Sequence, residues 1–145
     1  MFIYLLLLPI VIYFCSIIFF LLGIKKANYI QNNDKSKKAV SVIVCVRNGE
    51  LSLPNILNDL SNQKYNGKLE FIIVDDESID HSSQVILEYA KKDSRIKYIN
   101  SKIDKSNLKL KKKALNAGIN FANHEFLLFT DVDCRVYDNW VQGMM

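Results

Sequence analysis

The segment AVSVIVCVRNGE, residues 39–50, decides how the rest of the sequence is interpreted. Its first eight residues, 39–46, are almost all apolar and rich in β-branched side chains, which is typical of a strand buried on both faces of a parallel sheet. Residues 47–50 (RNGE) then break the run with polar and turn-forming side chains. We therefore predict a central strand over 39–46 that ends in a polar loop.

Further apolar runs on the C-terminal side alternate with segments of helical periodicity. Strands are predicted at 39–46, 69–74, 95–100 and 126–130. Helices are predicted after the capping candidates Ser52 and Asp80, and from Ala114 onward. The order β-α-β-α-β-α-β predicts an α/β fold with a parallel sheet and helices on both faces. Ligands of such sheets bind beyond the carboxyl ends of the strands.

Acidic residues stand at two of these carboxyl ends. Asp131 and Asp133 follow the fourth strand, where two carboxylates can hold a hard divalent cation that neutralises a diphosphate. Asp75 and Asp76 follow the second strand and can accept hydrogen bonds from a nucleotide base or a ribose hydroxyl. The alternatives are a solvated turn for the first pair, and capping of the following helix by Asp76 and Asp80 for the second.

A lysine cluster precedes the last predicted helix and comprises Lys109, Lys111, Lys112 and Lys113. These ammonium groups can pair with phosphate, or they form a solvated basic face. The formal net charge is only +4, and no aromatic side chains are interleaved with the lysines, so we do not expect a nucleic-acid partner.

Residues 1–24 contain no charged side chain. As a helix they reach roughly 36 Å, enough to cross a bilayer core of about 30 Å, so we predict one transmembrane anchor. Lysines follow this span and none precedes it, which places the remainder in the cytoplasm, with 25–38 as a polar linker. The three cysteines form no CxxC motif, which fits a reducing compartment.

Four stretches in this order resemble glycosyltransferase family 2, whose members have the Rossmann-like GT-A fold of nucleotide-diphospho-sugar transferases. They are VSVIVCVRNGELSLPNILNDLSNQKY, LEFIIVDDESIDHSSQVI, KKKALNAGI and FLLFTDVD. The resemblance covers residues 39–140. It implies that 39–145 are the nucleotide-sugar-binding half of an incomplete GT-A domain.

The resemblance also implies roles for individual residues in binding the nucleotide. Val46, Asn48 and Glu50 match a nucleotide-contacting loop, Asp75 matches the residue that contacts the base, and Asp76 is its neighbour near the ribose.

The remaining matched residues concern the diphosphate and the cation. Asp131 and Asp133 match the metal-binding DxD motif, with Mg²⁺ or Mn²⁺ as the cation. Lys111 is similar to a family lysine that usually follows glycine, but Leu110 precedes it here, so Lys112 and Lys113 are alternatives.

The resemblance implies a membrane-anchored enzyme of envelope glycan or glycolipid synthesis. Its donor is a nucleotide-diphospho-sugar, with a UDP-sugar favoured, and its acceptor is a lipid or glycan hydroxyl attacked with inversion. The acceptor site and general base are expected beyond Met145, so the chain alone is expected to be inactive. The alternatives are a non-catalytic nucleotide-binding remnant, a receiver-like Mg²⁺-binding domain starting near Leu69, and a haloacid-dehalogenase-like phosphatase.

Overall fold

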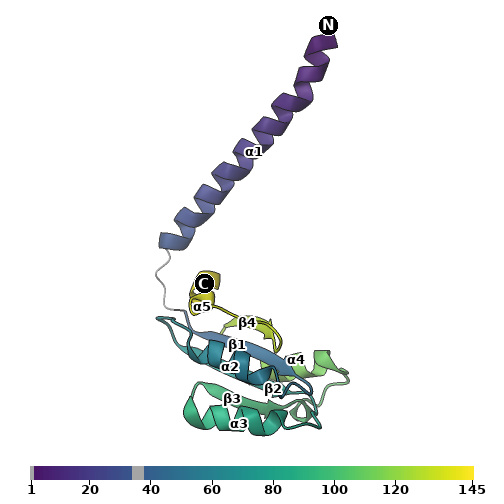
Figure 1. Ribbon diagram of the computed structural model, residues 1–145, viewed down its shortest axis with the longest axis vertical. Helices are drawn as coiled ribbons and strands as arrows, with labels where there is room; N and C mark the ends of the chain where they lie inside the picture. The colour runs from purple at the N-terminus through teal and green to yellow at the C-terminus, as the bar shows by residue number, and fades with distance from the viewer. Residues whose placement is uncertain (1, 34–37) are drawn as a thin grey trace. The chain divides into compact units, whose positions relative to one another are not determined.

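The structure is a computed structural model that describes residues 2–33 and 38–145, with side chains for 8–23 and 38–145 (Figure 1). The chain divides into two units, Met1–Ser36 and Lys37–Met145.

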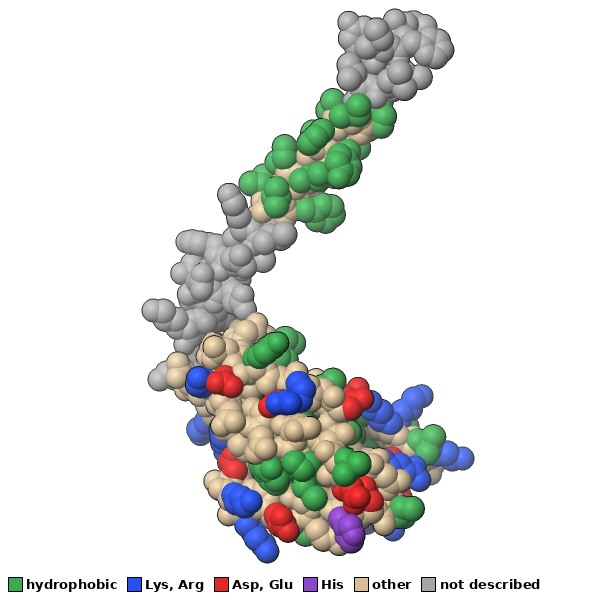
Figure 2. All heavy atoms as spheres, viewed as in Figure 1, with side chains coloured by type: hydrophobic (Ala, Val, Ile, Leu, Met, Phe, Trp, Pro, Cys, Tyr) green, Lys and Arg blue, Asp and Glu red, His purple; other side chains and the backbone are tan. Residues whose placement is uncertain are grey.

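The first unit is helix α1, Phe2–Asn33. Most of its described apolar side chains are exposed, as Figure 2 shows for the green part of the helix. Among the residues with described side chains, no helix is long and apolar enough to cross a membrane, and the predicted span 1–24 also includes residues outside that part. Because α1 continues to Asn33, residues 25–33 of the predicted linker 25–38 are helical.

The second unit contains a four-stranded parallel sheet with the order β3-β2-β1-β4. Its strands are β1 (Val40–Val46), β2 (Leu69–Asp75), β3 (Ile96–Asn100) and β4 (Phe126–Asp131). The prediction of a parallel α/β sheet is confirmed. The long apolar runs are explained by position, because β1 and β2 are the inner strands and are covered on both faces.

Helices cover both faces of this sheet, as predicted. They are α2 (Leu53–Ser61), α3 (Ser82–Lys92), the 3₁₀ turn η1 (Ser101–Ile103), α4 (Lys111–Phe121) and the short α5 (Trp140–Met144). The core on the α2, α3 and α5 side includes Leu57, Phe71 and Ile86, whereas Ile43, Ile72 and Ala117 belong to the core on the α4 side. Pro54 occupies the first turn of α2, where its missing N–H is not needed.

Gly118 sets the distance between α4 and the sheet. A Cβ added there would lie 2.6 Å from Cγ2 of Ile43 and 3.1 Å from Cγ2 of Val74. Any side chain at this position would therefore push α4 away from β1 and β2. The glycine therefore allows α4 to pack closely on β1 and β2.

A buried carboxylate ties the opposite, amino edge together. Glu70 in β2 accepts hydrogen bonds from Ser41 Oγ (2.6 Å), Lys97 Nζ (2.6 Å) and the backbone and side-chain nitrogens of Asn123 (2.8 and 2.9 Å). His124 N–H donates to Ser41 Oγ (3.2 Å). Burial would raise the pKa of Glu70, but these hydrogen bonds outweigh it and lower the pKa to about 2. The network joins β1, β2 and β3 to the turn before β4.

We expect Glu70→Gln to reduce the free energy of unfolding at pH 7 by about 2–4 kcal/mol, because the substitution leaves buried donors without their charged acceptor. The folded-state pKa lies below the ordinary value of 4.5, so this contribution is present above pH 4.5 and is lost as the pH falls toward about 2. Urea unfolding of the intact chain at several pH values measures it.

Glu88→Gln is the control, because Glu88 is an exposed carboxylate on α3. It should unfold like the wild type at every pH. An equal loss of stability for Glu70→Gln at pH 7 and at pH 2.5 would show that the charge of Glu70 is not what stabilises the fold.

Candidate functional site

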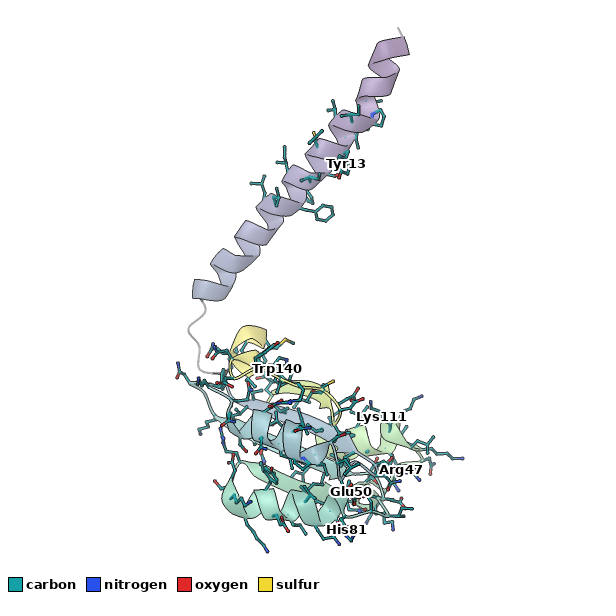
Figure 3. The ribbon with its side chains drawn as sticks, in the orientation of Figure 1. Tyr13, Arg47, Glu50, His81, Lys111 and Trp140 are labelled. Atoms are coloured by element: carbon teal, nitrogen blue, oxygen red, sulfur yellow. The ribbon has the colours of Figure 1, made fainter. Side chains whose placement is uncertain are left out.

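The register of the parallel strands brings the carboxyl ends of all four strands to one edge. Cys45 of β1 is paired with Asp131 of β4, and Val46 is paired with Asp75 of β2. Asp75 is in turn paired with Asn100 of β3. Figure 3 shows Arg47 and Lys111 at this same end of the sheet, away from Trp140. The polar residues predicted at separate strand ends therefore lie along one line.

A cleft of about 410 Å³ opens at this edge, and we call it the carboxyl-edge cleft. It is lined by Cys45, Val46, Arg47, Asp76, Leu110, Lys111, Asp131, Val132 and Asp133. The structure thus brings together five of the predicted site residues, which are Val46, Asp76, Lys111, Asp131 and Asp133. Asn48, Glu50 and Asp75 do not line the cleft.

The shortest polar contact of the cleft joins Lys111 to Asp131. Lys111 Nζ lies 2.6 Å from Asp131 Oδ1, and both side chains are more than half exposed, at 62% and 56%. The hydrogen bond to Asp131 raises the pKa of Lys111. Asp131 therefore already holds a positive charge at the place where the sequence predicts a cation.

Asp76 faces the cleft from the end of β2. Its backbone N–H donates to Val46 O at 2.7 Å, which fixes the first residue after β2 against the end of β1. One carboxylate oxygen accepts from Ser101 Oγ at 3.0 Å. A polar ligand can therefore meet Asp76 in a fixed orientation.

The carboxylate of Asp75 is buried and is hydrogen-bonded within the protein. Its side chain is only 3% exposed. Oδ1 accepts the Ser78 N–H at 3.0 Å, and Oδ2 is within 3.3 Å of Tyr98 Oη and 3.5 Å of Asn100 Nδ2. The bond from Ser78 closes the turn after β2, and the other two contacts link the end of β2 to β3. A contact between Asp75 and a nucleotide base stays a prediction from the family resemblance.

Asn48 connects the loop after β1 to the loop after β2. Its backbone N–H donates to Ser78 Oγ at 2.9 Å, and its Oδ1 accepts the Ile79 N–H at 2.9 Å. This needs the left-handed conformation at Asn48 (φ 52°), which asparagine adopts more readily than most residues. The side chain is thus engaged with the protein itself.

Glu50 adds two hydrogen bonds between the same two loops. Its N–H donates to Asp80 Oδ2 (3.1 Å), while its Oε2 accepts the His81 N–H (2.9 Å). Asp80 Oδ1 also accepts the Ser82 N–H at 3.0 Å, but the N-cap of α3 is His81, so Asp80 supports the helix start from one residue earlier than predicted. Asn48 and Glu50 position the two loops that border the cleft, and direct contact with nucleotide stays a prediction.

Cys45 is a cleft residue that sequence analysis did not select, because it lies inside an apolar strand. Its thiol also lines an adjoining, largely apolar cavity of about 360 Å³ that includes Leu115, Ile119 and Phe129. Burial raises the pKa of Cys45 to about 11, although Lys111 opposes the shift. The thiol is therefore protonated and unreactive at neutral pH in this state.

Leu110 explains why a glycine would suit the position before Lys111. Its backbone has φ 53° and ψ −144°, a combination that costs a residue with a Cβ about 1–3 kcal/mol. The side chain is 70% exposed and contributes little packing in return. The strain is located where the chain turns into α4 and places Lys111 at the helix start.

We expect Leu110→Gly to raise the free energy of unfolding by about 1 kcal/mol, since relief of strain exceeds the added entropy of the unfolded chain. Thermal unfolding of the intact chain measures this change. Leu108→Gly is the matched control. Because Leu108 does not have a positive φ, this substitution should lower the free energy of unfolding of the chain. A loss of stability in Leu110→Gly would contradict the assignment of strain.

The acidic residues suit a cation that is shared with a ligand. Asp131 and Asp133 line the same cleft, two residues apart. Among the residues that the structure describes, no three His, Cys, Asp or Glu side chains are grouped closely enough to form a metal site by themselves. A cation such as Mg²⁺ is commonly held by one or two carboxylates together with substrate phosphates, and this arrangement fits that case.

The fold and the cleft define a class of protein, a parallel α/β domain with an acidic ligand site at its carboxyl edge. Comparison with known families makes this specific, because the family described as glycosyl transferase family 2 matches residues 41–145. The chain belongs to this family. The receiver and phosphatase interpretations are therefore excluded, since the match begins at β1 and includes the segment that a receiver domain starting near Leu69 would leave unexplained.

The chain is also similar to individual proteins, which agrees with this family assignment. EpsH of Bacillus subtilis (strain 168) is 36% identical over 107 residues, which are 74% of this chain and 29% of that protein. The structure of residues 1–349 of S. aureus TarS in complex with UDP-GlcNAc has 27% identity and a TM-score of 0.62, covering 73% of this chain and 30% of that one.

A mannosyltransferase from Pyrobaculum calidifontis, in complex with GDP-Man and Mn²⁺, shares the fold with a TM-score of 0.65 at 22% identity, over 74% of this chain and 31% of that one. The chain spans less than a third of the length of these relatives.

Proposed function

We propose that this chain forms the donor-binding part of a glycosyltransferase that moves a sugar from a nucleotide-diphospho-sugar, preferably a UDP-sugar, to an acceptor hydroxyl. The observation that carries the proposal is the meeting of Asp76, Asp131 and Asp133 with Arg47 and Lys111 in one cleft at the carboxyl edge. A donor of this class carries a diphosphate, and the cleft offers both cationic groups and ligands for a divalent cation.

Each side of the cleft has a separate task in this proposal. Asp131 and Asp133 would hold Mg²⁺ or Mn²⁺, which when bound neutralises charge on the departing nucleoside diphosphate. Lys111 would contact a phosphate oxygen, and Asp76 would accept a hydrogen bond from the ribose. The TarS and mannosyltransferase complexes support a nucleotide-sugar ligand, and the latter supports Mn²⁺ as the cation.

Sugar transfer itself requires groups that this proposal does not assign within residues 1–145. An acceptor hydroxyl must lose its proton as it attacks, and a carboxylate general base with an acceptor site is proposed to lie in a further part of a longer polypeptide. The product would have inverted configuration, and the acceptor would be a lipid or a glycan of the cell envelope. The chain studied alone should bind donor without transferring sugar.

Titration calorimetry of the intact chain with UDP and Mn²⁺ tests the donor site. We expect binding that requires the cation and that weakens at least roughly tenfold in Asp131→Ala/Asp133→Ala, because charge-assisted contacts to the cation are lost. Asp138→Ala is a control, since Asp138 is an exposed acid paired with Lys64 outside the cleft. GDP in place of UDP measures the preference for the base.

The outcomes separate the candidate functions. Cation-dependent binding without sugar transfer supports a donor-binding unit, whether it acts in a longer enzyme or as a non-catalytic nucleotide-binding remnant. Failure of a folded chain to bind either nucleotide would remove the proposed role of every cleft residue.

Membrane attachment through α1, with the second unit in the cytoplasm, is a proposal from the sequence alone. We expect the intact chain to stay with the membrane fraction after an alkaline carbonate wash. Replacing Ile12 and Ile18 by arginine should move most of it to the supernatant, because arginine near the centre of a span costs about 2.5–3.5 kcal/mol per residue. Equal release of the wild type and the variant would refute the anchor.

A further inference from the structure

We infer that the Lys111 ammonium is a resident counter-cation of Asp131, which it exchanges for the divalent cation when a nucleotide diphosphate enters the cleft. Lys111 would thereby couple cation binding to nucleotide binding. The inference rests on the proposed function, because it concerns the same cleft and the same class of ligand.

The ion pair occupies the position that a divalent cation needs. Lys111 Nζ is 2.6 Å from Asp131 Oδ1, so a divalent cation bound to that carboxylate would be repelled at close range by the ammonium charge. Both residues line the carboxyl-edge cleft and the adjoining apolar cavity, so both are accessible to a ligand in the cleft. In the absence of ligand, a cation must compete with the lysine for Asp131.

The surroundings of Lys111 favour its transfer to an anion. Lys111 is the first residue of the 11-residue helix α4, where the helix dipole is positive and repels cations. Lys112 and Lys113 follow directly, and the first turn holds no acidic side chain. Asp131 offsets this repulsion, and a diphosphate would offset it more strongly because it carries more negative charge.

The exchange is feasible because the pair is exposed. Pairs with this degree of exposure contribute little to stability, about 0–1 kcal/mol, so the contact can break at low cost. Once Lys111 contacts the diphosphate, Asp131 is available to the cation. The structure therefore predicts that nucleotide and cation strengthen each other's binding, while the cation alone binds weakly.

Calorimetry of the intact chain with Mn²⁺ alone, UDP alone and both together tests this inference. Lys111→Met removes the charge but keeps the length of the side chain. We expect Mn²⁺ alone to bind roughly two- to fivefold more tightly to this variant, because its competitor is gone. UDP with Mn²⁺ should bind roughly tenfold more weakly, because the phosphate contact is lost.

Lys112→Met controls for general repulsion, since Lys112 forms no ion pair with Asp131 within the described part of the chain. Its Mn²⁺ affinity should match the wild type. Lys111→Arg keeps a charge and should retain the weak Mn²⁺ affinity and the coupling. Thermal unfolding of each variant confirms that it is folded.

The two opposite changes in Lys111→Met distinguish exchange from a purely structural role. Unchanged Mn²⁺ affinity in Lys111→Met, with binding still lost in Asp131→Ala/Asp133→Ala, would overturn the exchange and leave the donor site standing. Equal tightening in Lys111→Met and Lys112→Met would also overturn it, as general repulsion. Absence of Mn²⁺-dependent UDP binding in the wild type would overturn the proposed function instead.

Discussion

The position of β1 between β2 and β4 is the constraint on which the rest of the structure depends. Because β1 is paired on both edges and covered on both faces, its register fixes where its neighbours end. Cys45 lies opposite Asp131 and Val46 opposite Asp75, so the polar residues that follow the strands must share one edge. A shift of one residue in either pairing would turn the alternate side chains of that strand to the opposite face and dismantle both cores. The site is therefore a consequence of the packing of one strand.

The loops at this edge are held by their own side chains. Asn48 and Glu50 exchange hydrogen bonds with the loop that follows β2, so the two loops act as one rigid border of the cleft. The three non-glycine residues with positive φ in the described part of the chain, Asn48, Glu77 and Leu110, all lie in loops that follow β1, follow β2 or precede α4. Strained backbone is concentrated next to the cleft, as is common at ligand sites whose geometry is fixed in advance.

Much of this architecture follows from the sequence, because hydrophobic periodicity reports burial directly. The apolar run at 39–46 predicted a strand buried on both faces, and the acids after the strands at 69–74 and 126–130 predicted the edge that carries the site. Periodicity says nothing about which side chains bond to one another. The engagement of Asn48 and Glu50 within the loops, the burial of Asp75 and the pairing of Lys111 with Asp131 all depend on contacts between residues distant in the chain. The role of Glu70 could not be predicted for the same reason. It is a single polar residue within an apolar strand, and its hydrogen-bond partners come from three other segments of the chain.

The charge contacts at the two edges of the sheet differ in how easily they can be broken, and the difference follows from burial. At the amino edge, Glu70 is 4% exposed and is surrounded by donors, so its charge cannot be released without leaving those donors unsatisfied. At the carboxyl edge, Lys111 and Asp131 form an equally short contact, but water reaches both. Water lowers the energy of separating such a pair, because each ion regains hydration when the contact breaks. A fold needs permanent pairs to join its segments, whereas a ligand site needs pairs that can open. Distances alone do not distinguish these two kinds of pair, but exposure does. By that criterion Lys111–Asp131 can open, as can the exposed pair Lys64–Asp138, and of these two pairs it is Lys111–Asp131 that lines the carboxyl-edge cleft.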